Sequence, residues 1–189
     1  MMPDQPNENE LSLQEVLEKG FQVYEDFPKQ GVIFQDFSPI LASPKLFARV
    51  IQEMSRQAID LGATKIVGIE CRGFLVGQPL AFQLGIPFVP ARKKGKLPGP
   101  VYKQDYDLEY GTDSIEVQQE RVQKGDRFLI VDDVIATGGT AAAAARCIEA
   151  GKAEVAGFSF LMEIEYLRGV QKLQQAFPQA TIWSVLKST

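Results

Sequence analysis

Two adjacent carboxylates, Asp132 and Asp133, are followed after two apolar residues by Ala-Thr-Gly-Gly-Thr, residues 136–140. The apolar run 128–131 before them predicts a buried strand, and the alanines 141–145 after them predict a helix. Ligands of open α/β sheets bind outside the carboxyl ends of the strands, and free N–H groups at a helix N-terminus bind phosphate. Neighbouring carboxylates suit sugar hydroxyls or a Mg²⁺ ion that keeps most of its waters. The segment therefore predicts a site for a phosphorylated sugar.

The alternative interpretation of this segment is a glycine-rich strand-to-helix turn that binds nothing. A Thr-Gly-Gly-Thr turn alone does not separate the two. The full order of strand, Asp-Asp, turn and helix is much more specific and favours the binding site. The turn lacks the Gly-Lys-Ser/Thr ending of a Walker A loop and the Gly-x-Gly-x-x-Gly of dinucleotide binders.

Cations follow two other predicted strands. Arg72 stands at the junction between an apolar strand, 65–69, and a helix, 73–84. Arginine is the bidentate partner of phosphate, although this one could simply pair with Glu70 at the surface. Four cations lie within residues 92–96, after another apolar strand. Such a run is often a solvated face, but in a protein of net charge −4 it can also attract a polyanion.

The chain has no histidine, so proton transfer must fall to other groups. Glu109, in a segment rich in tyrosine, is a candidate general acid or base, and a solvated loop glutamate is the alternative. Nearer the N-terminus, Phe34 can stack on a purine while backbone groups near Ile33 read its edge. A simple packing segment is the alternative for these residues.

Composition sets the class of protein. The 189 residues favour one domain, 1–189, and 45% hydrophobic content is ordinary for a soluble protein. An acidic balance disfavours a nucleic-acid binder. The two cysteines lack metal-ligand spacing. No run approaches the ~20 apolar residues of a membrane span, and residues 1–10, a mobile tail in our prediction, have no apolar signal region. We expect no membrane partner and a cytoplasmic location.

Strands alternate with helices along the chain, which predicts an α/β fold with a twisted, mostly parallel sheet flanked by helices. A short amphipathic helix is expected near 11–17, a polar loop over 92–107 and a strand or hairpin arm over 110–117. The segment 21–40 fits the alternation poorly and is expected to form a cap, here called the hood. The main predicted strands are 65–69, 86–91, 128–131, 154–162 and 181–186, and the main predicted helices are 44–58, 73–84, 140–150 and 166–177.

Five motifs occur in a specific order: Phe-Pro-x-x-Gly-Val-x-Phe-x-Asp, Glu-x-Arg-Gly-Phe, Arg-Lys-x-Gly-Lys-Leu-Pro, Leu-Glu-Tyr-Gly and Val-Asp-Asp-x-x-Ala-Thr-Gly-Gly-Thr. Over roughly residues 20 to 170 the chain resembles the type I phosphoribosyltransferase family. The last motif marks the whole family, and the third and fourth resemble its adenine-specific members. The resemblance implies that adenine and 5-phosphoribosyl 1-pyrophosphate give AMP and pyrophosphate, with Mg²⁺. It also implies a flexible loop, the hood over the base, and a homodimer.

The resemblance also implies roles by motif position. Asp132 and Asp133 would hold the ribose hydroxyls and the Mg²⁺ environment, and Glu109 would assist proton transfer at the base. Tyr110 would belong to the closing loop. The remaining implied roles are 5′-phosphate binding by Ala136, Thr137, Gly138, Gly139 and Thr140, pyrophosphate binding by Arg72, Arg92 and Lys96, and base binding by Ile33, Phe34 and Gln35.

One residue departs from the family pattern. Gln35 stands where the family commonly has arginine, and an amide cannot supply the charge or the fork of a guanidinium. We expect Phe34 and the backbone to keep adenine selectivity while affinity is weaker. Two other functions use the same scaffold: a regulator that senses 5-phosphoribosyl 1-pyrophosphate without catalysis, and a transferase for another purine such as xanthine. The acidic chain with no spare domain disfavours the regulator.

Overall fold

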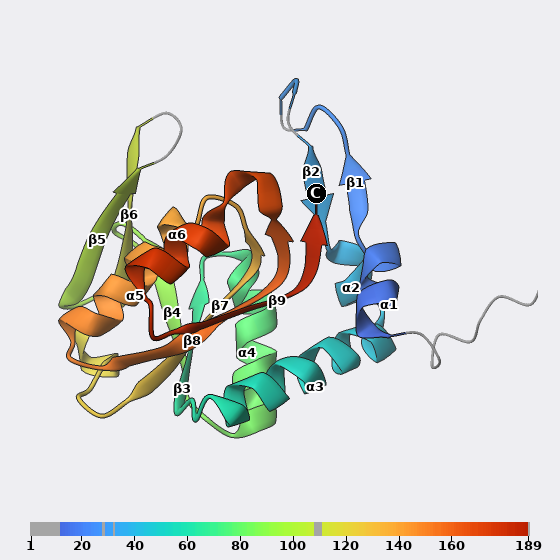
Figure 1. The fold of residues 1–189 in the computed structure, drawn as a ribbon. Helices are drawn as coiled ribbons and strands as arrows, with labels where there is room; N and C mark the ends of the chain where they lie inside the picture. Colours follow the sequence, from blue (N-terminus) through green and yellow to red (C-terminus); the bar gives the residue numbers. More distant parts are fainter. Residues whose placement is uncertain (1–11, 28, 32, 108–110, 189) are drawn as a thin grey trace, which may run out of the picture. The chain divides into compact units, whose positions relative to one another are not determined.

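The structure is a computed structural model that describes residues 12–188 apart from 28, 32 and 108–110 (Figure 1). The chain divides into two compact units, residues 1–52 and 53–189, and the boundary falls within helix α3, Pro44–Asp60. Within the described residues, no helix is long and apolar enough to cross a membrane.

The first unit contains α1 (Leu13–Gly20), β1 (Gln22–Tyr24), β2 (Phe34–Asp36) and α2 (Ser38–Ala42). The predicted amphipathic helix is present, and a capping box fixes its start: the Ser12 hydroxyl accepts the Glu15 N–H, and the Glu15 carboxylate accepts the Ser12 N–H. In the hood, β1 and β2 pair antiparallel. Helix α3 begins at Pro44, as the sequence predicts.

The second unit is built on a seven-stranded sheet with the order β5-β6-β4-β3-β7-β8-β9 (Figure 1). The strands from β4 through β3, β7 and β8 to β9 are parallel, whereas β6 runs antiparallel to both β4 and β5. The mostly parallel α/β prediction is confirmed. The bounds are β3 (Lys65–Ile69), β4 (Phe88–Lys93), β5 (Val101–Asp107), β6 (Thr112–Gln118), β7 (Arg127–Ile135), β8 (Glu154–Ile164) and β9 (Thr181–Ser188).

Helices cover both faces of this sheet. Phe128 and Ile130 of β7 belong to the buried cluster that also contains α5 residues such as Ile148. Leu129 and Val131 are equally buried, and alternation along a strand turns them to the opposite face. In Figure 1, α5 and α6 lie on one side of the sheet and α4 on the other. The bounds are α4 (Arg72–Leu84), α5 (Gly139–Ala150) and α6 (Gly169–Ala176), with 3₁₀ turns η1 (Gln119–Arg121) and η2 (Glu165–Leu167).

Two segments differ from the sequence prediction. The expected polar loop over 92–107 instead contains the end of β4 and the whole of β5, which pairs with β6 from Val101↔Gln118 to Asp107↔Thr112. Since β5 is an edge strand, it can be polar and still form. The helix expected over 166–177 is broken, because Arg168 adopts a left-handed conformation (φ 56°) between η2 and α6.

The burial of two isoleucines predicts a large difference in how much each contributes to the free energy of unfolding. Ile130 is fully buried in β7, whereas Ile59 on α3 is 66% exposed. Ile130→Ala should lower the free energy of unfolding by about 2–5 kcal/mol, because it leaves a cavity, and Ile59→Ala by about 0.5 kcal/mol or less. Urea unfolding of both variants measures this, and equal losses would contradict the described core.

Candidate active site

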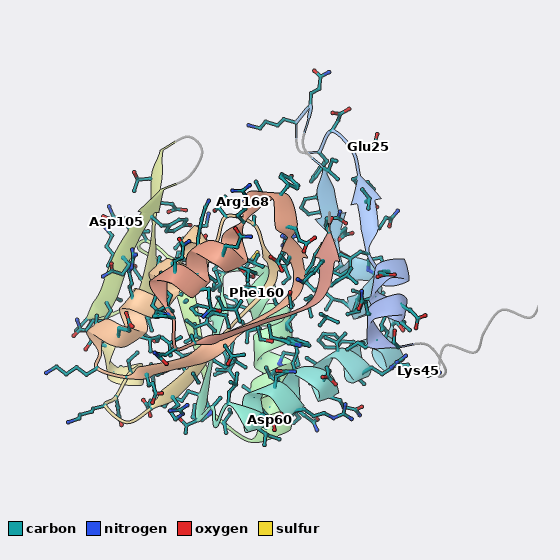
Figure 2. The ribbon with its side chains drawn as sticks, viewed as in Figure 1. Glu25, Lys45, Asp60, Asp105, Phe160 and Arg168 are labelled. Atoms are coloured by element: carbon teal, nitrogen blue, oxygen red, sulfur yellow. The ribbon has the colours of Figure 1, made fainter. Side chains whose placement is uncertain are left out.

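The strand-to-helix turn after β7 forms a small pocket of about 90 Å³. Phe160 of β8, labelled in Figure 2, is 1% exposed and contributes to its wall. The five residues predicted to bind a phosphate group all line this one pocket, together with one of the two carboxylates. The lining residues are Asp132, Val134, Ile135, Ala136, Thr137, Gly138, Gly139, Thr140, Ala141 and Phe160.

The residues that line the pocket include the start of helix α5, whose position has a geometric reason. Helix α5 begins at Gly139, and its N-cap, Gly138, has φ 79° and supplies no side-chain hydrogen bond. A Cβ atom at Gly138 would lie 2.9 Å from the carbonyl oxygen of Gly169, so both the conformation and the space require glycine. The first N–H groups of a helix have no partner within it. They are therefore available to an anion in the pocket.

The two carboxylates occupy different environments. Asp132 is half-buried and lines the pocket, whereas Asp133 is 2% exposed. The Asp132 carboxylate accepts the N–H of Asp133 at 3.0 Å. Burial, and then the neighbouring negative charge of Asp133, raises the pKa of Asp132 well above its usual range. Burial also raises the pKa of Asp133, although Arg72 opposes the shift. Cationic or hydroxyl groups of a ligand would stabilise this pair.

Arg72 opens helix α4 directly beside this pair. Its Nε atom lies 2.9 Å from Oδ2 of Asp133. Arg72 is therefore paired with Asp133, whereas Glu70, the partner that the sequence offered, pairs with Arg92 and Lys96. The close approach depends on Gly73, where a Cβ atom would lie 2.6 Å from the carbonyl oxygen of Val131 and 3.0 Å from Oδ1 of Asp132. The structure thus brings together Arg72, Asp132, Asp133 and the phosphate turn.

The basic segment 92–96, which begins in the last residues of β4, is held by acidic side chains that the sequence did not single out as site residues. Arg92 Nε lies 3.2 Å from Oε2 of Glu70, and Lys96 Nζ also pairs with Glu70. Lys93 pairs with Asp113 of β6 at 3.0 Å. The position of Glu70 at the end of a predicted strand was the available signal for its role. The sequence carried no such signal for Asp113, which lies in an expected strand or hairpin arm.

The residues predicted to bind a base lie in the first unit. Ile33 is 59% exposed, and Phe34 packs edge-on against Phe27 with ring centroids 5.2 Å apart. Gln35 is half-buried in β2 and stands opposite Val23 in the register. The predicted catalytic Glu109 and the loop residue Tyr110 fall outside the described residues.

A larger pocket of about 550 Å³ lies at the other end of the strands. Its lining includes Arg127 and Glu154, the first residues of β7 and β8. It contains none of the predicted site residues, and ligands of open α/β sheets bind at the opposite, carboxyl ends. The small pocket is therefore the better candidate in spite of its size.

Comparison with known proteins agrees with this site. The family model of the phosphoribosyl transferase domain matches residues 37–187, which include both the acidic pair and the turn. The chain belongs to the type I phosphoribosyltransferase family.

Its relatives within that family are adenine phosphoribosyltransferases. The one from Streptomyces avermitilis is 45% identical, over 94% of this chain and 97% of its own. The crystal structure from Thermoanaerobacter pseudethanolicus is 40% identical with a TM-score of 0.87, covering 94% of this chain and 100% of its own. The Saccharomyces cerevisiae enzyme, complexed with adenine and an imino-altritol bisphosphate, is 38% identical with a TM-score of 0.85, covering 92% and 98%.

The contacts of Asp113 predict an acid-dependent contribution to stability. The Ser114 N–H and then Lys93 hold the pKa of Asp113 below its usual value of 3.8. A carboxylate with a lowered folded-state pKa stabilises the fold above the unfolded-state pKa, and this contribution is lost as the pH falls through the folded-state pKa. Asp113→Asn should therefore reduce stability at pH 7 and match the unmodified chain well below about pH 3. Urea unfolding at both pH values checks this, and a constant difference would refute it.

Proposed function

We propose that the protein transfers the 5-phosphoribosyl group of 5-phosphoribosyl 1-pyrophosphate to adenine, giving AMP and pyrophosphate. The observation that carries the proposal is the convergence of the phosphate turn, an acidic pair and Arg72 at the carboxyl ends of two neighbouring strands. Adenine as the acceptor rests on the relatives, which are named for it.

The pocket supports a division of roles among its residues. The turn 136–140 would hold the 5′-phosphate through its backbone N–H groups. Asp132 and Asp133 would face the ribose, where breaking the bond at the anomeric carbon builds positive charge, as in glycoside hydrolysis. Arg72, with Arg92 and Lys96, would stabilise the departing pyrophosphate. These fixed charges supply preorganised electrostatic stabilisation.

The acidic pair also fits a magnesium ion that arrives with the substrate. Carboxylate oxygens are the ligands that Mg²⁺ prefers, and a nearby cation would favour the ionised forms of both carboxyl groups. Within the described residues, no group of three or more His, Cys, Asp or Glu side chains gathers to hold a metal. Asp132 and Asp133 would therefore supply part of the coordination, the substrate and water the rest. The ion would neutralise charge on the pyrophosphate.

The base would be held by the segment that contains Ile33, Phe34 and Gln35. Phe34 offers a ring for stacking and the backbone at Ile33 offers hydrogen bonds to a purine edge. We further propose that Glu109 assists proton transfer at the base and that Tyr110 belongs to a closing loop. The homodimer remains a prediction from the family resemblance, and the cytoplasmic location remains a prediction from the sequence.

A turnover assay tests the proposed function directly. The protein is supplied with 5-phosphoribosyl 1-pyrophosphate, Mg²⁺ and one of adenine, hypoxanthine, guanine or xanthine, and nucleotides are separated by chromatography. We expect AMP from adenine and no nucleotide from the other three bases. Turnover with xanthine alone would establish a sibling transferase. Binding of the sugar substrate without turnover of any base would establish a regulator.

Asp133 should matter for turnover more than for stability. The ion-pair partner of Asp133, Arg72, has a side chain that is 36% exposed and can be solvated by water, so Asp133→Asn should cost only modest stability. The same change removes the negative charge beside Arg72 and the ribose. We expect kcat/KM to fall about 100-fold or more, which corresponds to about 2.7 kcal/mol of transition-state stabilisation.

The matched control is Asp126→Asn, directly before the first residue of β7 and away from the proposed site. Asp126 pairs with Lys65 at 2.7 Å and touches none of the proposed site. This variant should keep its activity, with at most a small loss of stability. Steady-state kinetics and thermal unfolding of both variants give the comparison. Full activity in Asp133→Asn would remove the central assignment.

A further inference from the structure

Four hydrogen-bond donors contact the Glu70 carboxylate. Arg92 contributes Nε at 3.2 Å and a terminal guanidinium nitrogen at 3.5 Å, and Lys96 contributes its ammonium group. The backbone N–H of Lys93 adds a fourth donor at 3.0 Å. The side chain of Glu70 is only 9% exposed. This carboxylate therefore ties the basic segment to the end of β3.

The contacts keep Glu70 ionised. Burial raises its pKa, but the hydrogen bonds from Lys96, Lys93 and Arg92 outweigh burial and leave the pKa below its usual value. The remaining guanidinium nitrogen of Arg92 donates to the Lys96 carbonyl oxygen at 3.2 Å, so the arginine is fixed in orientation. A full negative charge thus lies against the two cations of this segment that are proposed to bind pyrophosphate.

We propose that Glu70 is a positioning residue that takes the place of pyrophosphate on Arg92 and Lys96, and thereby weakens pyrophosphate binding. This inference rests on the proposed roles of those two cations. An incoming pyrophosphate must either displace Glu70 from them or share them with it. Displacement leaves a nearly buried carboxylate with fewer partners, and sharing places like charges side by side. Either way, part of the attraction is lost, and release of the leaving group becomes easier.

The test is the affinity for pyrophosphate with Mg²⁺, measured by isothermal titration calorimetry. Glu70→Gln keeps an acceptor for the Lys93 N–H and removes the charge. We expect its dissociation constant to fall about threefold to tenfold at low salt. The gain should shrink at about 0.5 M salt, because screening weakens charge–charge interactions. A purely structural role would give neither the gain nor its salt dependence.

Glu116→Gln is the matched control. Glu116 of β6 is a second buried carboxylate that contacts the basic segment, where it accepts the backbone N–H of Gly95 at 2.9 Å. Its substitution should change pyrophosphate affinity much less than Glu70→Gln. Glu70→Asp withdraws the carboxylate by one methylene and should tighten binding in the same direction by less. It decides the matter if Glu70→Gln fails to fold.

The variant Arg92→Ala distinguishes a failure of the role proposed for Glu70 from a failure of the proposed pyrophosphate site. If the unmodified protein binds pyrophosphate and Arg92→Ala weakens that binding, the proposed site holds. Unchanged or weaker binding by folded Glu70→Gln then overturns this inference alone. If the unmodified protein binds no pyrophosphate, or if Arg92→Ala leaves the affinity unchanged, both this inference and the assignment of the basic segment are wrong.

Discussion

The parallel pairing of β3 with β7 is the contact on which the site depends. The register runs from Lys65↔Phe128 to Gly68↔Val131, so both strands deliver their next residues to the same edge of the sheet. Arg72 and Asp133 meet there although they are far apart in the sequence. The missing side chain at Gly73 lets the first turn of α4 approach β7 closely enough. A shift in the register between β3 and β7 would separate Arg72 from both carboxylates.

The sequence was sufficient where local chemistry decides the structure. Continuous apolar runs predicted β3 with its correct bounds, and Gly85 marked the end of α4. The pocket residues 136–140 were also predictable, because strand, turn and helix follow one another directly. Strand β5 was missed because polar edge strands form through pairing with a neighbour and have no apolar pattern of their own. The partners of Arg72 and Arg92 come from distant segments that only the tertiary fold brings together.

The cations of the proposed site each lie against a carboxylate. Arg72 faces Asp133, Arg92 and Lys96 face Glu70, and Lys93 faces Asp113. Each pair orients long side chains that would otherwise sample many rotamers. Local cations of this kind can attract a polyanion even though the whole chain carries a net charge of −4. Net charge alone would have been a poor guide to the ligand.

The two regions that are proposed to bind anions differ in construction, and the proposed reaction gives a reason for that difference. The turn 136–140 offers backbone N–H groups on a fixed helix end, without a competing acidic side chain among the residues that form the turn. The basic segment offers side-chain cations that already have carboxylate partners. In the proposed reaction the 5′-phosphate stays on the product, whereas the pyrophosphate must leave. A cradle of backbone N–H groups suits the group that is retained, and side-chain cations that also contact a carboxylate suit the group that is released.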